Sequence, residues 1–358
     1  MSQHGGNLAE ISREYGVDPE KLVDYSANIN WLGPPEEIEQ VIRDSIDGIV
    51  NYPDHQYYKF REAVGKKVGV KVENIIAGNG AVELIYLLAK VLAPKQALVL
   101  APTFSEYAQA VKSVGGSVER YYLDAEDDFQ IEVSDLAAKF EAVDLFFLCN
   151  PNNPTGTVLN RKQAIKLVEA ARKQDTFLVV DEAFVDFTTE EITVADLVTK
   201  YPNLFVLRSM TKFYSIPGLR LGYGVGSKEL ISRLGEAKDP WNVNFLAQKV
   251  GEQAVKLEDY QLKTLKAISK EREHFCEQLQ EIFAFKVYYP KANYILIELT
   301  NTSYTAPKLK KDLLPEGFLI RDCSNFPGLD ENYIRLAVKE REDNLRLVEV
   351  LESLVISR

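Results

Sequence analysis

The sequence predicts an α/β protein with a large domain built on a mostly parallel sheet, followed by a small α+β domain. Apolar runs alternate with helical segments between residues 75 and 225, which is typical of parallel strands covered by helices on both faces. Beyond about residue 285 the pattern changes to short strands and one closing helix. A length of 358 residues also favours two domains over one.

We expect three parts along the chain. Residues 1–40 form an N-terminal arm and a first small helix, residues 41–283 form the large domain with a long linker helix, and residues 284–358 form the small domain. The linker helix is predicted from apolar residues at near-helical spacing over 260–283. Further helices are expected at 36–46, 81–92, 106–114, 133–140, 161–173, 243–255 and 342–354. Strands are expected at 294–299, 318–320 and 333–338. Five more strands are expected in the apolar runs that end at Leu100, near Tyr122, at Leu148, at Val180 and at Leu207.

Composition narrows the class of protein. A net charge of −11 argues against a nucleic-acid-binding surface, although a few local arginines can still bind an anionic small molecule. Cys149, Cys276 and Cys323 lack paired spacing, so we expect reduced thiols in a cytoplasmic protein, and no metal site. The polar start MSQHGGN is not typical of a signal peptide, and no uncharged apolar run is long enough to span a bilayer.

The stretch RSMTKFYSIPGLRLGYG, residues 208–224, carries the strongest chemical signal. It follows an apolar run typical of a buried strand and places Ser209 and Thr211 near Lys212, with Arg220 eight residues further on. Hydroxyls and an arginine suit a phosphate dianion, and a lysine among cations is a candidate nucleophilic amine, because such neighbours lower its pKa. A phosphate beside an aldehyde that condenses with lysine describes pyridoxal phosphate. This segment alone leaves a solvated basic loop open as the alternative.

Three other segments supply groups that pyridoxal phosphate needs. Asp181 ends an apolar run and is the candidate acid for the pyridine nitrogen. Asn153, in CNPNNPTG, is the candidate donor to the phenolic oxygen, and Phe104, in APTFSEY, is placed to stack on the ring. Because open α/β sheets bind ligands at the carboxyl ends of their strands, we expect these residues and Lys212 to share one site.

A helix start is the candidate holder of the cofactor phosphate. The sequence GNG at residues 78–80 directly precedes the helix predicted at 81–92. Free backbone N–H groups and the helix dipole favour an anion at such a position. The residues expected to hold the phosphate there are Gly80, Ala81 and Val82.

Together these motifs resemble the fold type I pyridoxal-phosphate enzymes of the aminotransferase superfamily, along most of the chain. Four further segments narrow the resemblance: HGGN at 4–7, SANIN at 26–30, NYPD at 51–54 and IRDCSNFPGLD at 320–330. They look like segments of the threonine-phosphate decarboxylases of cobalamin biosynthesis, which are near relatives of the histidinol-phosphate aminotransferases. The HGGN and CSNFPGLD segments are the discriminating ones.

The resemblance implies roles for five more residues. His4 in the arm and Asn28 are expected to contact the substrate. Tyr52 is expected to cross a homodimer interface to the cofactor phosphate of the neighbouring subunit, which makes the active site composite. Arg321 directly follows one predicted strand and Arg335 lies in another, and the two strands flank the CSNFPGLD loop. An arginine in such a strand usually faces water, but the implied substrate carries two anionic groups, which favours a clamp made by both.

Two positions depart from the patterns of relatives: Phe184 from that of the aminotransferases, where the threonine-phosphate decarboxylases resemble this sequence, and Trp31 from that of the decarboxylases themselves. Phe184 stands three residues after Asp181, where many histidinol-phosphate aminotransferases have a tyrosine that donates to the phenolic oxygen, so Asn153 would make that contact with less help. Trp31 replaces an expected proline. If its indole points inward, it fills space beside the substrate and lets serine phosphate compete with threonine phosphate. If it packs outward, against the arm or a dimer partner, it has no such effect.

We therefore expect a pyridoxal-phosphate-dependent decarboxylase, a lyase, that acts on threonine O-3-phosphate or serine O-phosphate and yields an amino-alcohol phosphate. Lys212 would bond to the cofactor, and Asp181 would keep its ring protonated. The alternative is a histidinol-phosphate or aromatic aminotransferase, because the cofactor site is shared. A non-catalytic regulator that senses the cofactor is disfavoured, because the short arm leaves no room for a preceding DNA-binding domain.

Overall fold

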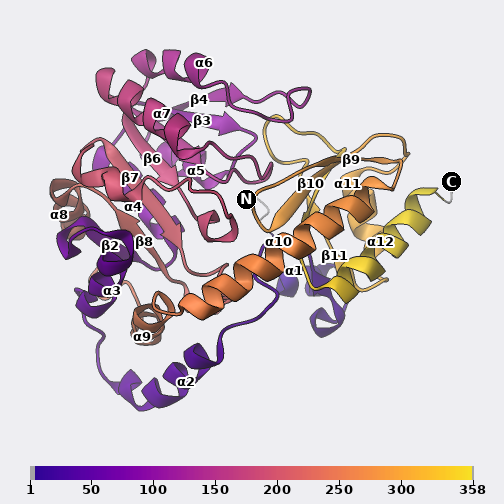
Figure 1. Cartoon of the computed structure of the whole chain (residues 1–358), viewed down its shortest axis with the longest axis horizontal. Coiled ribbons are helices and arrows are strands. Elements are labelled where there is room, and N and C mark those ends of the chain that lie inside the picture. Colours follow the sequence, from indigo (N-terminus) through magenta and orange to yellow (C-terminus); the bar gives the residue numbers. More distant parts are fainter. Residues whose placement is uncertain (1–4, 357–358) are drawn as a thin grey trace.

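The computed structural model describes residues 5–356. Figure 1 shows a large sheet with its helices on one side of the molecule and a smaller domain on the other, with the 23-residue helix α10 (Glu258–Gln280) running between them. The two parts have separate clusters of buried apolar side chains. The predicted α/β fold is therefore confirmed, while the domain boundaries at residues 40 and 283 stay predictions.

The large sheet has seven strands in the order β2-β8-β7-β6-β5-β3-β4. Its neighbouring strands are parallel except where β8 runs antiparallel to β2 and β7. The prediction of a mostly parallel sheet is thus confirmed. The strands are β2 (Ile75–Gly78), β3 (Gln96–Ala101), β4 (Ser117–Tyr122), β5 (Leu145–Cys149), β6 (Phe177–Asp181), β7 (Leu204–Ser209) and β8 (Gly222–Val225).

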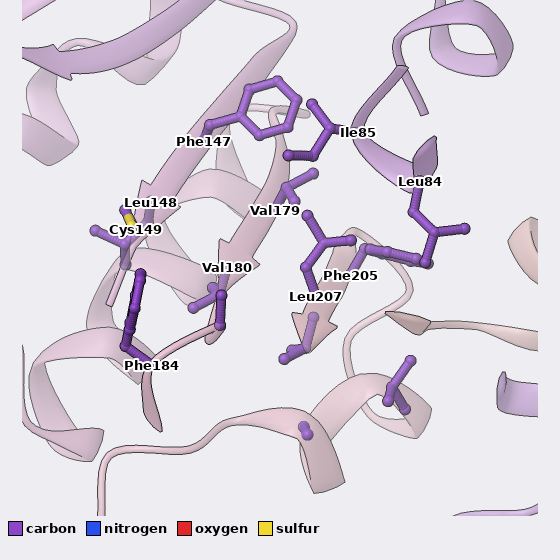
Figure 2. Close-up of a cluster of buried hydrophobic side chains, with 14 of the residues drawn as sticks. Leu84, Ile85, Phe147, Leu148, Cys149, Val179, Val180, Phe184, Phe205 and Leu207 are labelled. Atoms are coloured by element: carbon purple, nitrogen blue, oxygen red, sulfur yellow. The ribbon is translucent and has the colours of Figure 1, made fainter. Parts of the chain in front are cut away.

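Helices cover both faces of this sheet, so its central strands are apolar and buried along almost their whole length. Figure 2 shows Leu84 and Ile85 of α4 lying against Phe147, Val179 and Phe205 of the sheet. This packing fixes the carboxyl ends of the strands, which carry the site. The helices of this part are α2 (Glu36–Ser45), α3 (Tyr58–Val68), α4 (Ala81–Leu92), α5 (Glu106–Ser113), α6 (Val133–Ala138), α7 (Arg161–Lys173), α8 (Lys228–Ala237) and α9 (Phe245–Ala254).

The small domain contains a four-stranded antiparallel sheet in the order β12-β13-β10-β9. Its apolar face packs against the last turns of α10 and against α12. The elements are β9 (Phe285–Tyr288), β10 (Tyr294–Leu299), α11 (Ala306–Leu313), β12 (Arg321–Asp322), β13 (Tyr333–Ala337) and α12 (Arg341–Ile356).

The N-terminal segment joins the small domain. Strand β1 (Val23–Asp24) pairs in parallel with β11 (Phe318–Leu319), and α1 (Leu8–Tyr15) packs Ile11 against Leu314 and Leu319. The strand predicted at 318–320 is confirmed at Phe318–Leu319, which form β11 and pair with β1, whereas the separate strand β12 pairs with β13 in the other sheet. The chain changes sheets at Ile320, and the apolar pattern does not show which partner each residue has.

Sequence reasoning also missed α3 and β8. Strand β8 reads GYGV, and glycine is poor in strands. The structure explains both glycines, because an added Cβ would lie 2.5 Å from the Ala81 nitrogen at Gly222 and 2.0 Å from the Phe205 ring at Gly224. Within residues 5–356, no helix combines the length and the apolar character that crossing a membrane requires.

Candidate active site

A cleft of about 720 Å³ lies at the carboxyl ends of β3, β5 and β7 and reaches the arm and the small domain. The order of the strands reverses between β3 and β5, and open α/β sheets bind ligands at such a point. The structure therefore brings together most of the predicted site residues. Those that line the cleft are Asn28, Gly80, Ala81, Val82, Phe104, Asn153, Ser209, Thr211, Lys212, Arg220, Arg321 and Arg335.

Lys212 follows β7 and points into a group of hydroxyls. Its Nζ donates to Ser209 Oγ at 3.1 Å, and that oxygen lies 2.9 Å from Thr211 Oγ1. Burial lowers the pKa of Lys212; the Arg220 charge lowers it further, while the Asp181 charge opposes both. The amine therefore loses its proton more easily than an exposed lysine and is a better nucleophile.

The loop that carries Lys212 is held by Asn30 of the SANIN segment. The Asn30 backbone N–H donates to the Lys212 carbonyl at 3.0 Å, and its Nδ2 donates to the Phe213 carbonyl at 2.9 Å. The same Nδ2 lies 2.8 Å from Tyr260 Oη on α10. The second asparagine of SANIN thus positions the lysine loop, a role that sequence reasoning did not assign.

Asp181 ends β6 and is buried next to the cleft rather than lining it. Its Oδ2 accepts from the Tyr107 hydroxyl at 2.7 Å, and its Oδ1 accepts from the Ala183 backbone N–H at 2.9 Å. Burial raises the pKa of Asp181, and both hydrogen bonds and the Lys212 charge act in the opposite direction. Sequence reasoning missed Tyr107, although its place three residues after Phe104 at the start of a helix was a usable signal.

The start of α4 and Arg220 form the candidate phosphate site. Gly80 has φ +83°, and an added Cβ would lie 2.5 Å from Nη2 of Arg220. Glycine therefore permits both the left-handed turn and the close approach of the guanidinium to the helix start. Backbone N–H groups, a guanidinium and the two hydroxyls of Ser209 and Thr211 are a donor set that matches a phosphate dianion.

Asn153 and Phe184 lie near the boundary of the two domains: Phe184 is close to Lys212, and Asn153 contacts Arg335 of the small domain. Asn153 Oδ1 accepts a hydrogen bond from Nη1 of Arg335. The peptide bond between Asn153 and Pro154 is cis. The Phe184 ring lies 5.4 Å from Lys212 Nζ, so an aromatic face stands where a hydroxyl donor would be expected in many aminotransferases.

Arg321 and Arg335 are both buried and both line the cleft. Nη2 of Arg321 donates to Asn325 Oδ1 at 2.7 Å, and Nη2 of Arg335 donates to the Ser26 carbonyl at 2.7 Å. Burial lowers the pKa of Arg335 to about 10. Neither arginine forms an ion pair with a carboxylate in the part of the chain that the structure describes.

The arm closes one side of the cleft. Gly5 and Gly6 line it, and the Gly6 backbone N–H donates to Ser26 Oγ at 2.8 Å. Asn28 also lines it, and its Oδ1 is buried without a hydrogen-bond partner among residues 5–356. His4, the predicted substrate contact of the arm, lies outside the described residues.

Two residues considered from the sequence lie elsewhere. Tyr52 is 80% exposed, and its ring lies on that of Trp241 with centroids 4.7 Å apart, away from the described lining of its own cleft. Trp31 is partly buried against the core of the large domain and is also absent from that lining. The described structure thus packs Trp31 against apolar side chains of the large domain, and its effect on substrate choice stays a prediction.

The residues present fit pyridoxal phosphate. A half-buried amine with a lowered pKa, a buried acid and a donor set for a phosphate meet at one cleft. The glycine at position 80 leaves space that any side chain would fill. Each feature corresponds to one end of that cofactor: aldehyde, ring nitrogen and phosphate.

The comparisons with known proteins agree with this geometry. Residues 20–351 match the model of the family described as aminotransferase class I and II. A threonine-phosphate decarboxylase from Salmonella typhimurium is 36% identical over 99% of this chain and 97% of its own length. The chain therefore belongs to the class I and II aminotransferase family.

Two solved structures have the same fold. The histidinol-phosphate aminotransferase from Clostridium acetobutylicum has a TM-score of 0.88 at 33% identity and covers 94% of this chain and all of its own. The L-threonine-O-3-phosphate decarboxylase from Porphyromonas gingivalis has a TM-score of 0.84 at 28% identity, with 93% and 99% covered. Both activities weighed from the sequence thus occur on this fold.

Proposed function

We propose that this chain is a pyridoxal-phosphate-dependent decarboxylase of an O-phosphorylated amino acid, L-threonine O-3-phosphate or L-serine O-phosphate. The observation that carries the proposal is the pair Arg321 and Arg335, two buried cations in the same cleft as Lys212. A substrate with a carboxylate and a phosphate supplies the two missing negative charges. The product is an amino-alcohol phosphate, and the sequence resemblance connects it with cobalamin biosynthesis.

The contacts of the two arginines distinguish their roles. Arg335 is bonded to Asn153, on the side of the cleft where Lys212 lies, so it is the arginine for the carboxylate on Cα. Arg321 is bonded to Asn325 in the CSNFPGLD loop and lies by Gly5 of the arm, so it is the arginine for the phosphate. Guanidinium groups suit both anions, because each offers paired donors in one plane.

When bound, pyridoxal phosphate supplies an electron-accepting ring for the negative charge that forms at Cα. Lys212 supplies the amine that bonds to the cofactor aldehyde, and its lowered pKa favours the neutral, nucleophilic form. Asp181, whose charged form the Tyr107 hydroxyl favours, would pair with the protonated ring nitrogen. Asn153 would donate to the phenolic oxygen.

Orientation decides which bond at Cα breaks. The bond that overlaps the ring π system is the one that lies perpendicular to the ring plane. Arg335 and Arg321, which both line the cleft, would hold the substrate at two points and so place the carboxylate rather than the hydrogen in that position. Such positioning is worth roughly 7–11 kcal/mol of barrier. After carbon dioxide leaves, the Lys212 amine is the candidate that delivers a proton to Cα.

We also propose that the functional unit is a homodimer. Ile46, Ile49 and Val50 are exposed close in sequence to Tyr52, whose ring packs on the exposed Trp241. Exposed apolar side chains grouped in this way favour a protein contact. The resemblance assigns Tyr52 to the neighbouring subunit's cofactor phosphate, and its place outside its own cleft supports that assignment.

The decisive experiment supplies threonine phosphate with and without a 2-oxoacid acceptor. A decarboxylase releases carbon dioxide and an amino-alcohol phosphate without any acceptor. The second candidate, a histidinol-phosphate aminotransferase, is retained because the structure from Clostridium acetobutylicum matches so closely. Turnover that requires the 2-oxoacid, with conversion of the cofactor to pyridoxamine phosphate in its absence, would overturn the proposal.

A further inference from the structure

Tyr294 of β10 contacts both halves of the site. Its hydroxyl donates to the Asn152 carbonyl at 2.7 Å, from the small domain to the loop that follows β5. The guanidinium carbon of Arg335 lies 5.4 Å from the centre of its ring. The same ring packs edge to face against Phe184, with centroids 4.9 Å apart. The Tyr294 side chain is fully buried, so it is held by these protein contacts and not by solvent.

The Asn152 end of this connection is fixed by a network of its own. Asn152 Nδ2 donates to the Pro102 carbonyl at 3.0 Å and to Thr155 Oγ1 at 2.9 Å, and its Oδ1 accepts from Thr103 at 2.7 Å. These bonds tie the loop after β5 to the loop after β3. A hydroxyl bonded to this carbonyl therefore has a defined position relative to the next residue, Asn153.

The Arg335 end lacks one partner. Its Nη1 and Nη2 are bonded to Asn153 and to the Ser26 carbonyl, but its Nε is buried without a hydrogen-bond acceptor among the described residues. The face of the Tyr294 ring supports the guanidinium on another side, and a cation over an aromatic face is attracted to it. The orientation of Arg335 therefore depends on where this ring lies.

We propose that Tyr294 is a positioning residue that sets where Arg335 lies relative to Asn153 and Lys212. It does so by bonding a small-domain strand to the Asn152 loop and supporting the guanidinium on its ring. Burial raises the pKa of Tyr294, so the hydroxyl remains a neutral donor at working pH. The inference rests on the proposed function only for the identity of the ligand, an anion with a carboxylate and a phosphate.

The test separates binding from turnover. The probe is 3-phosphoglycerate, which carries both anionic groups but no amine and so binds without reacting. Its Kd would be measured by calorimetry on the cofactor-loaded wild type, Tyr294→Phe and Tyr294→Leu. The matched control is Tyr288→Phe, because Tyr288 is also buried in this sheet and donates to Glu298 at 2.7 Å, away from the described cleft lining.

We expect Tyr294→Phe to raise the Kd of 3-phosphoglycerate roughly 3- to 10-fold, the effect of one lost hydrogen bond, and Tyr294→Leu to raise it further. Tyr288→Phe should leave this Kd unchanged, although it should lower the melting temperature by about as much as Tyr294→Phe does. In an Arg335→Lys background, Tyr294→Phe should have little further effect, because both changes act through one group.

A Tyr294→Phe protein with the wild-type Kd for 3-phosphoglycerate would show that the hydroxyl only stabilises the fold and would overturn the inference. Additive effects of Tyr294→Phe and Arg335→Lys would overturn it too. If Tyr294→Leu fails to fold, the Kd values of Tyr294→Phe and of the control Tyr288→Phe still test the inference. Failure of the wild type to release carbon dioxide from threonine phosphate would count against the proposed function alone, since the probe does not react.

Discussion

Arg321 and Arg335 occupy directly opposite positions in the antiparallel pair formed by β12 and β13. Like charges opposite each other destabilise a sheet, by roughly 0.2–1 kcal/mol, and the burial of both side chains adds to this cost. Within residues 5–356, the hydrogen bonds of both guanidinium groups go to amide and carbonyl oxygens, which do not neutralise them. The described part of the fold thus keeps two unneutralised positive charges at the place where a substrate with two anionic groups would bind.

The first prediction concerns this repulsion. Arg321→Met should stabilise the free protein by about 0.5–1 kcal/mol, because it removes one of two opposed charges and fills the space with an apolar chain. The same change should abolish the rise in melting temperature that 3-phosphoglycerate produces in the wild type. Calorimetric melting checks both effects, with Arg43→Met as an exposed control. A destabilised variant that is still stabilised by the ligand would contradict the prediction.

The second prediction uses pyridoxal, which lacks the phosphate, as a probe of Lys212. Apoprotein should attach it faster as pH rises, with a midpoint below the ordinary lysine pKa of 10.5, because burial lowers the pKa of Lys212 and the neutral amine reacts. Arg220→Met should move the midpoint upward, since the positive charge of Arg220 also lowers that pKa. Absorbance follows the attachment.

Borohydride reduction and peptide mapping provide the control for that experiment. The labelled peptide should contain Lys212, and Lys212→Ala should remain unlabelled at that peptide. A Lys228→Ala change, at an exposed position in the first turn of α8, should alter neither the midpoint nor the labelled peptide. A midpoint at or above 10.5 in the wild type would show that Lys212 is not perturbed as described.

The third prediction concerns Tyr107. Tyr107→Phe removes a hydrogen bond that lowers the pKa of Asp181, so that pKa rises further. Affinity for pyridoxal phosphate should fall as pH decreases through the Asp181 pKa, because a protonated acid no longer attracts the ring nitrogen, and in the variant this fall should begin at higher pH. Equilibrium dialysis at a series of pH values measures it. Tyr201→Phe, which loses a hydroxyl bonded to Glu169, should behave like the wild type.

The fourth prediction concerns the arm. An added Cβ at Gly5 would lie 2.0 Å from the Ser26 carbonyl oxygen, which also accepts from Arg335. Gly5→Ala should therefore displace the arm and raise KM for threonine phosphate roughly tenfold, the effect of about 1.4 kcal/mol, with little change in melting temperature. Gly235→Ala meets no atom within 4 Å and should leave KM unchanged. An unaltered KM in Gly5→Ala would show that the arm does not contribute to substrate binding.

The fifth prediction tests the composite site. Tyr52→Ala and Lys212→Ala proteins should each be nearly inactive, but subunit exchange should restore about a quarter of wild-type activity, because half of randomly paired dimers contain one intact site. Exchange and activity can be followed together by native mass spectrometry and carbon dioxide release. Complete absence of recovery despite proven exchange, or a fully active monomer, would show that Tyr52 acts within its own chain or not at all.

Local pattern was enough to identify much of the site. Lys212, Asp181 and Asn153 each follow an apolar run, and the ends of parallel strands meet at one edge of a sheet. Tyr107 and Tyr294 were missed, because their partners lie 74 and 142 residues away in the sequence. A tyrosine in an apolar segment has the same local signature whether or not its hydroxyl finds a functional partner.

The sequence alone predicted the α/β fold and the residue types of the cleft, because hydrophobic period and short motifs are properties of neighbouring residues; the cofactor chemistry that it assigns to Lys212 stays a prediction. Three features became visible only in the tertiary structure: Arg321 lies opposite Arg335, the Ser26 carbonyl binds Arg335 across 309 residues, and Trp31 packs against the core of the large domain. Strand register and long-range packing depend on the whole path of the chain. The contacts that orient a substrate are set at that level.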